Sequence, residues 1–416
     1  MPKRAPTWLT CSQRFTHSIV ADAARLCIAL ALLCGVSGAG SGNASPSPTV
    51  QDLVTLYDRA MTDPNAPAVQ RFEVVGTIAG AALTGTFHEW QDGDDERTDQ
   101  SLGLRQESTI RLGERYFFVS STGNVREYRG SLLRRSRTQT LIDSGDLAGT
   151  PDCCRLGGTQ VVDGVNAEEL VVTAPGGDTE SLFVDPQTGL PLRLAYEEDD
   201  GTTTVDLSDW RSYGGRRFPF KSVSSDGNHD FDITQITTSI TMNEPIDPAI
   251  FAVPANRSIE TAGVQHLDLV EHDAHLFAPV SISGHAYTFL VDTGAQSILL
   301  DESVARQLHL HEEGALEASG AARTGGLHLA KLDDLEVAGA TMHDLVVTTL
   351  DLGASTEGAF HIDGILGYPF FASAAVRIDF AHETMDFGPP GSLTPSGDRL
   401  NADFDRGLVE LPAMAN

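Results

Sequence analysis

The stretch FLVDTGAQSILL, residues 289–300, places one acidic side chain, Asp292, between an apolar run and a small turn-like sequence. A carboxylate held there can act as a general base that takes a proton from water, so that the water can attack an amide carbonyl. The same residue types also suit an ordinary turn, and a chain of 416 residues meets Asp-Thr-Gly by chance quite often. The triplet Asp292-Thr293-Gly294 therefore needs support from the rest of the sequence.

A second triplet of the same kind serves as an internal control. It lies in LIDSGDL, where Asp143, Ser144 and Gly145 also follow two apolar residues. No apolar pair followed by glycine occurs in the window about 55 to 95 residues downstream of it. We therefore expect Asp143, Ser144 and Gly145 to form a turn without catalytic function.

Asp292 has the companion that the control triplet lacks. An apolar pair and a glycine follow it within that window, and a glycine-rich stretch lies between; the residues are Ile365, Leu366 and Gly367, and Gly320, Gly325 and Gly326. This order of features resembles the retropepsin-like aspartic proteases. The resemblance covers the whole second domain of the chain, residues 260–392. The resemblance implies a closed β-barrel, a catalytic aspartate, and a hairpin flap over the substrate. The chain departs from viral members at Tyr368-Pro369, where those carry a basic residue, which puts a salt-bridge role there in doubt.

The resemblance also implies roles for individual residues. Asp292 would be the catalytic carboxylate, and Thr293 would send its hydroxyl to the backbone of a partner loop. Gly294 would leave room for that close approach and for substrate, because a Cβ there would intrude. Support of the loop would fall to Ala295, Ile365, Leu366 and Gly367. The flap is placed within Ala318–His328, where Gly320, Gly325 and Gly326 would give it freedom to open and close.

Amide hydrolysis by carboxylates needs two of them. At about 3 Å two carboxylates share one proton, and their apparent pKa values separate into a base and an acid. Asp292 supplies one, so we expect a homodimer with its site on the two-fold axis. An alternative is that the tail GLVELPAMAN begins a second repeat, because Leu408–Glu410 match Leu269–Glu271. No cofactor is needed. His309 and His311 are two residues apart, but no known zinc spacing surrounds them, so we expect no metal site.

The region before this domain is different in pattern. Val50, Leu53, Val54, Tyr57 and Met61 repeat at helical spacing, with Thr49 as N-cap and Asp52 three residues on. From Phe72 to Ile240, short β-prone segments alternate with turn residues. Two of them predict hairpins that turn at Pro186–Gly189 and at Gly214-Gly215. We expect a large antiparallel sheet curled around one helix.

The same hairpin sequences, VDPQTGLPLRL and DWRSYGGRRFPFK, are similar to the C-terminal strands of the periplasmic lipoprotein-carrier and sorting family. The likeness covers roughly residues 48–254 and implies an unclosed β-barrel that covers an apolar cavity, with an apolar ligand in this domain. A Pro- and Asn-rich segment, residues 243–258, marks the boundary. The predicted organisation is a leader at 1–40, a flexible lead-in at 41–48, a carrier-like domain at 49–256, a protease-like domain at 260–392 and a tail at 393–416.

The leader has the layout of a secretory signal. Basic residues precede the apolar run Leu26–Val36, small residues follow, and the run is too short to span a bilayer as a stable helix. We expect export to the periplasm or beyond; a retained anchor is the alternative. Three cysteines leave with the leader, and Cys153 and Cys154 form either a strained local disulfide or two plain thiols. The net charge of -30 argues against nucleic acid as a partner.

Together these features predict a mainly β, exported aspartic endopeptidase that acts on peptides or proteins. The rival hypothesis is a binding module, in which the first domain carries an apolar ligand or lipoprotein and the second is a silent dimerisation unit. Retention of Asp292 and Thr293 favours the enzyme, because two carboxylates facing each other repel and have no use in a silent interface.

Overall fold

The computed structural model describes residues 48–67, 69–198, 201–317, 326–353, 361–400, 402–405 and 408–410. Strands make up 53% of the structure, which confirms the mainly β class predicted from the sequence. The predicted leader and nearly all of the lead-in lie outside the described residues. Within the described part, no helix is both long and apolar enough to cross a membrane.

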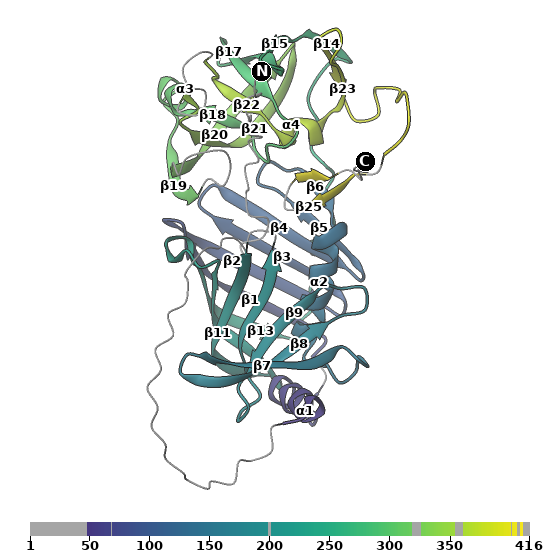
Figure 1. The fold of residues 1–416 in the computed structure, drawn as a ribbon, viewed down its shortest axis with the longest axis vertical. Coiled ribbons are helices and arrows are strands. Elements are labelled where there is room, and N and C mark those ends of the chain that lie inside the picture. The colour runs from purple at the N-terminus through teal and green to yellow at the C-terminus, as the bar shows by residue number, and fades with distance from the viewer. Residues whose placement is uncertain are drawn as a thin grey trace, which may run out of the picture. The chain divides into compact units, whose positions relative to one another are not determined.

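The chain forms two compact units that do not simply follow chain order, and Figure 1 colours its strands and helices along the sequence. The first contains Gln70–Leu133 and the described residues from Thr238 onward, and the second contains the described residues before 70 together with Arg134–Thr237. The strands of the N-terminal half follow the open order β6-β5-β4-β3-β2-β1-β13-β12-β11-β10-β9-β8-β7. This is the large antiparallel sheet that the turn pattern predicts. The division into domains at 49–256 and 260–392 stays a prediction.

The second unit is organised around helix α1, Val50–Met61. The Thr49 side chain accepts a hydrogen bond from the Asp52 backbone, and the Asp52 carboxylate accepts one from the Thr49 backbone, which is a capping box. The predicted helix and its cap are therefore confirmed. Its buried face packs on the inner side of β8 and β9; the cluster includes Leu53, Val54, Tyr57, Met61, Leu170, Val172, Leu182 and Val184.

Both predicted hairpins are present in this unit. The turn at Pro186–Gly189 joins β9 to β10, and Gly214-Gly215 joins β11 to β12, where Tyr213 pairs with Arg216. The strands are β7 (Cys154–Val162), β8 (Val165–Thr173), β9 (Thr179–Val184), β10 (Pro191–Glu198), β11 (Gly201–Tyr213) and β12 (Arg216–Ser225). Cys153 and Cys154 are free thiols.

Helix α2, Gly130–Ser144, is missing from the sequence-based expectation, which has only strands between Phe72 and Ile240. Its sequence GSLLRRSRTQTLIDS has apolar residues only toward its two ends and so lacks a continuous apolar face. Leu132 packs with Tyr116, Phe118 and Tyr128, and Ile142 joins the α1 cluster. Tertiary packing at the two ends therefore supports a helix that local periodicity does not reveal.

The control triplet lies at the C-terminal end of α2. Asp143 and Ser144 are the last helical residues, and Gly145 takes a positive φ of 65°, the left-handed conformation that commonly follows a helix. The isolated turn expected at this triplet is thus the last turn of a helix.

The first unit includes the meander β1 to β6 and the part of β13 from Thr238 onward. These strands are β1 (Arg71–Gly80), β2 (Leu83–Asp92), β3 (Asp95–Leu102), β4 (Arg105–Leu112), β5 (Arg115–Val119), β6 (Val125–Glu127) and β13 (Ile233–Met242). The registers are continuous from β1 to β4, as in the pairing of Arg71 with Asp92 and of Asp95 with Leu112. A short 3-10 helix at Pro248–Phe251 follows β13 in this unit, and another at His229–Phe231 precedes β13 and belongs to the second unit.

The rest of the first unit is a mixed sheet that closes on itself. Its order is β15-β16-β17-β22-β18-β21-β20-β19, and an additional pairing of β16 with β20 closes six strands into a near-barrel. The strands are β15 (Val270–His272), β16 (His275–Ile282), β17 (His285–Val291), β18 (Leu299–Asp301), β19 (Glu312–Glu317), β20 (Gly326–Val337), β21 (Ala340–Leu350) and β22 (Gly364–Leu366). The interior is apolar and includes Phe289, Leu335, Leu345 and Phe370.

Short elements complete this region. They are helix α3, Glu302–Gln307, and the antiparallel hairpin of β23 (Ala375–Asp379) with β24 (Thr384–Gly388). Helix α4 spans Tyr368–Ser373, and β14 (Gln265–Asp268) pairs with β24. In the tail, β25 (Asp403–Asp405) pairs with β26 (Leu408–Glu410).

Candidate active site

Asp292 is the first residue after β17, at the point where this strand runs parallel to β22. Val291 pairs with Leu366, and the Asp292 backbone N–H donates to the Leu366 carbonyl at 3.3 Å. The two segments that the sequence pattern links are therefore neighbouring strands. One of them carries the Asp292 loop, and the other fixes where that loop begins.

The Asp292 carboxylate sits in a tight turn of its own loop. The Gly294 N–H donates to Asp292 Oδ1 at 2.8 Å, and the Ala295 N–H donates to the Asp292 carbonyl at 3.3 Å. Burial raises the pKa of this carboxyl above its usual value, against the opposing effect of the Gly294 and Ala295 N–H groups and of His275. The group is thus held partly away from water, in surroundings that favour its neutral form.

Thr293 and Gly294 occupy the open side of the loop. Thr293 is exposed, and a Cβ at Gly294 would lie 3.2 Å from Asp292 Oδ1. Any larger side chain at position 294 would therefore press on the carboxylate. The partner-loop contact that the family resemblance implies for Thr293 stays a prediction.

The segment Ile365, Leu366 and Gly367 is buried directly against the loop. A Cβ at Gly367 would come within 2.0 Å of the Ser297 carbonyl oxygen and 2.7 Å of the Ala295 carbonyl oxygen, which leaves no space for any side chain. The Tyr368 N–H donates to the Ala295 carbonyl at 2.7 Å. These contacts fix the 365–367 segment against the backbone of the Asp292 loop, and its functional role in supporting catalysis stays a prediction.

The predicted flap falls largely outside the described residues, which include neither Gly320 nor Gly325. The two strands on either side of it, β19 and β20, are antiparallel, and Glu317 pairs with Gly326. The described residues on the two sides of the predicted flap are therefore antiparallel partners. The role of the segment between them as a flap stays a prediction.

Asp292 has no acidic neighbour among the groups that influence its pKa in the described part of the chain. Among the described residues, no three side chains of histidine, cysteine, aspartate or glutamate are grouped as metal ligands, and His309 and His311 belong to no such group. One chain therefore presents a single candidate carboxylate in this loop.

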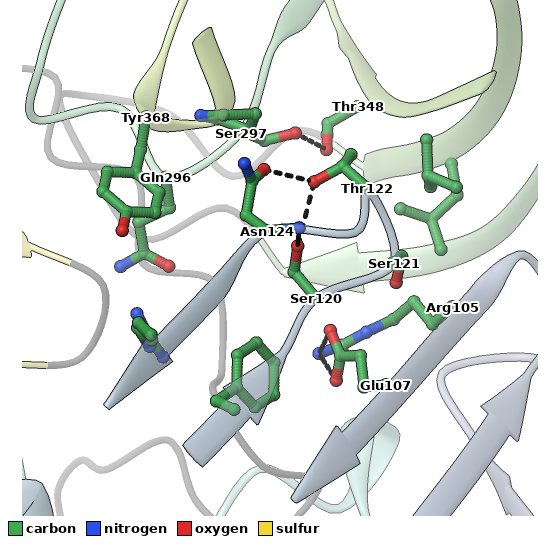
Figure 2. Close-up of a pocket in the computed structure, with 15 residues that line it drawn as sticks. Arg105, Glu107, Ser120, Ser121, Thr122, Asn124, Gln296, Ser297, Thr348 and Tyr368 are labelled. Carbon is green, nitrogen blue, oxygen red and sulfur yellow. Dashed lines mark hydrogen bonds and ion pairs between the residues drawn. The ribbon is translucent and has the colours of Figure 1, made fainter. Parts of the chain in front are cut away.

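A cavity lined by both polar and apolar side chains lies beside the same loop and could not be foreseen from the sequence (Figure 2). Its walls include Gln296 and Ser297 of the loop, Tyr368 of α4, and residues of β4, β5 and β6 such as Arg126. Residues more than 150 positions apart meet there. No local pattern marks such a cavity, because it is created by long-range packing.

Residues 278–370 match the family model of the aspartyl proteases. The match includes both the Asp292 loop and the Ile365-Leu366-Gly367 segment, so the chain contains an aspartyl protease family domain. A search of curated proteins found no match to the chain.

Several solved structures are similar to parts of the chain. A DUF1329 family protein from Desulfovibrio piger is 15% identical, with 50% of this chain and 98% of the other covered and a TM-score of 0.35. A LolA superfamily protein from Nitrosomonas europaea is 14% identical, with 49% and 98% covered and a TM-score of 0.34. A retropepsin-like aspartic protease from Rickettsia conorii is 17% identical, with 32% and 95% covered and a TM-score of 0.23.

Proposed function

We propose that the domain around Asp292 is an aspartic endopeptidase, whose catalytic dyad forms from the Asp292 carboxylates of two copies of the chain. The observation that carries this proposal is the setting of Asp292. It is a half-buried carboxyl of raised pKa, held by the buried Gly367 segment, next to an exposed Thr293, within the aspartyl protease family match.

The proposed chemistry follows from bringing two such groups together. Burial already disfavours the charge on Asp292, and a second carboxylate at about 3 Å would raise one of the two pKa values further. One Asp292 then stays protonated while the other is ionised. The ionised group takes a proton from a water molecule, whose oxygen attacks the peptide carbonyl carbon.

The remaining protons return through the same pair. The protonated carboxyl gives its proton to the carbonyl oxygen as the C–O bond becomes single, and a tetrahedral diol forms. The proton taken from water is then delivered to the amide nitrogen as the C–N bond breaks. The diol oxygen returns its proton to the dyad, so the enzyme ends in its starting state with one proton shared.

A homodimer is part of the proposal. The described part of one chain offers no acidic partner for Asp292, and the exposed position of Thr293 leaves this side of the loop free to face a copy. An isologous contact at the loop would bring Asp292 to its own equivalent. The substrate class is a peptide or protein, and export remains a proposal that depends on the predicted leader.

The direct test is cleavage of an unfolded protein between pH 3 and pH 7, with and without pepstatin. We expect wild-type activity that pepstatin blocks and that Asp292→Asn lowers by at least about 1,000-fold, because an amide cannot exchange the proton. Asp143→Asn is the matched control, an exposed aspartate in the second triplet, and should keep wild-type activity. Equal cleavage by wild type and Asp292→Asn, or none at any pH, would favour the binding module.

A further inference from the structure

The cavity beside the Asp292 loop has a volume of about 80 Å³. Figure 2 shows the two kinds of wall: the Arg105–Glu107 pair and the linked polar side chains of Ser120, Thr122 and Asn124 on one side, with Gln296 and Tyr368 on the other. A water molecule needs about 10–15 Å³ on the same measure. The space therefore accepts several waters, or one small group with a short stem.

The wall is held in place by buried hydrogen bonds. Thr122 donates its hydroxyl hydrogen to Asn124 Oδ1 at 2.8 Å, and Asn124 Nδ2 donates to Ser373 Oγ at 2.9 Å. Ser373 in turn donates to the Pro369 carbonyl at 2.7 Å, one residue from Tyr368. The loop between β5 and β6 is thus fixed to α4, and the cavity is formed before any ligand arrives.

Arg126 on β6 is the unusual member of the wall. Its side chain is 8% exposed, and Nε, Nη1 and Nη2 are all buried without a hydrogen-bond partner in the part of the chain that the structure describes. Its guanidinium lies 4.9 Å from the centre of the Phe118 ring. Burial lowers its pKa to about 10, so the group still carries its charge at neutral pH.

The other charged side chains of the cavity do not neutralise the charge of Arg126. Arg105 Nη2 lies 3.0 Å from Glu107 Oε2, and both side chains are largely buried, so this pair neutralises itself. The cavity wall therefore keeps one uncompensated positive charge, in a chain whose net charge is -30. A buried charge without a counter-ion is strongly unfavourable, and an anion at Arg126 would remove that penalty.

The rest of the lining indicates what kind of anion fits. Phe118, Leu329, Val346 and Pro369 contribute apolar surface around the charged group. One unpaired guanidinium matches a single negative charge, and its forked N–H groups suit the two oxygens of a carboxylate. A dianionic phosphate would leave an unpaired negative charge in the same apolar surroundings.

We propose that this cavity binds a carboxylate on a short apolar stem, with the Arg126 guanidinium as its counter-ion. The carboxylate can be the C-terminus of a peptide or a free carboxylic acid, which share this chemistry. Tyr368 is half-buried and interacts electrostatically with Arg126, so it lies close to the proposed anion site. This site does not depend on hydrolysis at Asp292, and binding can be measured in the inactive Asp292→Asn protein.

The test compares N-acetyl-leucine, its uncharged amide, hexanoate and inorganic phosphate as ligands of the full chain at pH 7. We expect the carboxylates to raise the midpoint of thermal unfolding by several degrees at saturation, and the amide and phosphate to have no effect. Tighter binding of N-acetyl-leucine than of hexanoate indicates a peptide C-terminus, and the reverse indicates a free acid. Equal shifts with the amide or with phosphate would overturn the proposal.

Two variants separate binding from folding. Arg126→Met should abolish the shift and weaken binding by calorimetry at least tenfold, while the unliganded protein unfolds at the same or a higher temperature, because an unpaired charge is removed. Arg115→Met makes the same change on the exposed side of β5, where Arg115 pairs with Glu127, and should keep the ligand response. A ligand response that persists in Arg126→Met, or a large loss of stability in that variant, contradicts the assignment.

Discussion

The two aspartate triplets of this chain have similar sequences and different structures. Asp292-Thr293-Gly294 follows a strand, and its carboxyl is half-buried with a raised pKa. Asp143-Ser144-Gly145 ends helix α2, where Asp143 is exposed and Gly145 supplies the positive φ that ends the helix. Gly294 leaves the space next to the Asp292 carboxylate free of a side chain, whereas Gly145 terminates a helix.

This difference comes from the residues that pack against each triplet. The Asp292 loop rests on β22 and on Gly367, whose position no side chain can share. The Asp143 triplet has different neighbours: Gly145 lies against Met61 of α1, and the Asp143 carbonyl accepts a hydrogen bond from Arg216 at 2.6 Å. The companion segment, more than the triplet, therefore carries the functional information.

The largest effect on stability should come from Gly367→Ala. The new Cβ would overlap two backbone carbonyls, at 2.0 Å and 2.7 Å, so the loop or β22 has to move. We expect the free energy of unfolding to fall by about 3 kcal/mol, together with the activity. Gly263→Ala is the control, because its Cβ would meet nothing within 4 Å, and urea unfolding should find it within about 0.5 kcal/mol of wild type.

A second comparison contrasts Asp292 with Asp301, a purely structural aspartate nearby. Asp301 is 5% exposed and caps α3, with its carboxylate accepting from Ser303 N at 2.8 Å and from Leu352 N at 2.9 Å. We expect Asp301→Ala to lower the free energy of unfolding by about 2 kcal/mol, because both donors lose their partner. Asp292→Asn should leave stability at pH 7 unchanged or slightly higher. Comparable losses of unfolding free energy in both variants would mean that Asp292 is also a structural aspartate.

Much of the fold could be predicted from such local signals. The capping box and the apolar spacing of helix α1 are visible in the sequence, and Gly214-Gly215 marks the β11–β12 turn. Helix α2 could not be predicted, because its few apolar residues act through packing at the two ends. Periodicity shows an element only when the element has one continuous buried face.

The residues of the candidate site also divide into those that the sequence reveals and those that it does not. The Asp292 loop and its Ile365-Leu366-Gly367 support could be found from order and spacing, and the structure places them side by side. The Arg126 cavity could not, since an arginine on a short strand normally reaches solvent. Arg126 is buried at a cavity whose other lining residues include Gln296 and Tyr368, which lie more than 150 positions away in the sequence.

Alanine at the two triplet glycines should have opposite consequences. Gly145→Ala forces a side chain into a positive φ and within 2.9 Å of Met61 Cβ, so we expect a loss of about 1 kcal/mol in stability and no loss of activity. Gly294→Ala meets only the Asp292 carboxylate, so the protein should stay folded while its cleavage rate falls at least about tenfold. Thermal unfolding and the cleavage assay, run on both variants, check this pairing. The account is wrong if Gly145→Ala is the inactive one.

The smallest predicted effect is the pH dependence of stability. Because the folded-state pKa of Asp292 is raised, its contribution to stability is fully present below the unfolded pKa of about 3.9 and is lost as pH rises through the folded pKa. Asp292→Asn, which has no such loss, should therefore gain stability relative to wild type between pH 3 and pH 7. Urea titrations at both pH values measure the gap. If the difference in unfolding free energy between Asp292→Asn and wild type is the same at pH 3 and pH 7, the pKa of Asp292 is not raised in the folded protein.

The central claim, that two copies each give one carboxylate, is tested most directly by mixing wild-type protein with the Asp292→Asn variant. The subunits are combined at constant total concentration, allowed to exchange, and assayed for cleavage. If mixed dimers are inactive, an equal mixture should retain about one quarter of the wild-type activity, because only pairs of wild-type chains have both acids. Retention of one half, in direct proportion to the wild-type fraction, would mean that each chain works alone and would contradict the shared dyad.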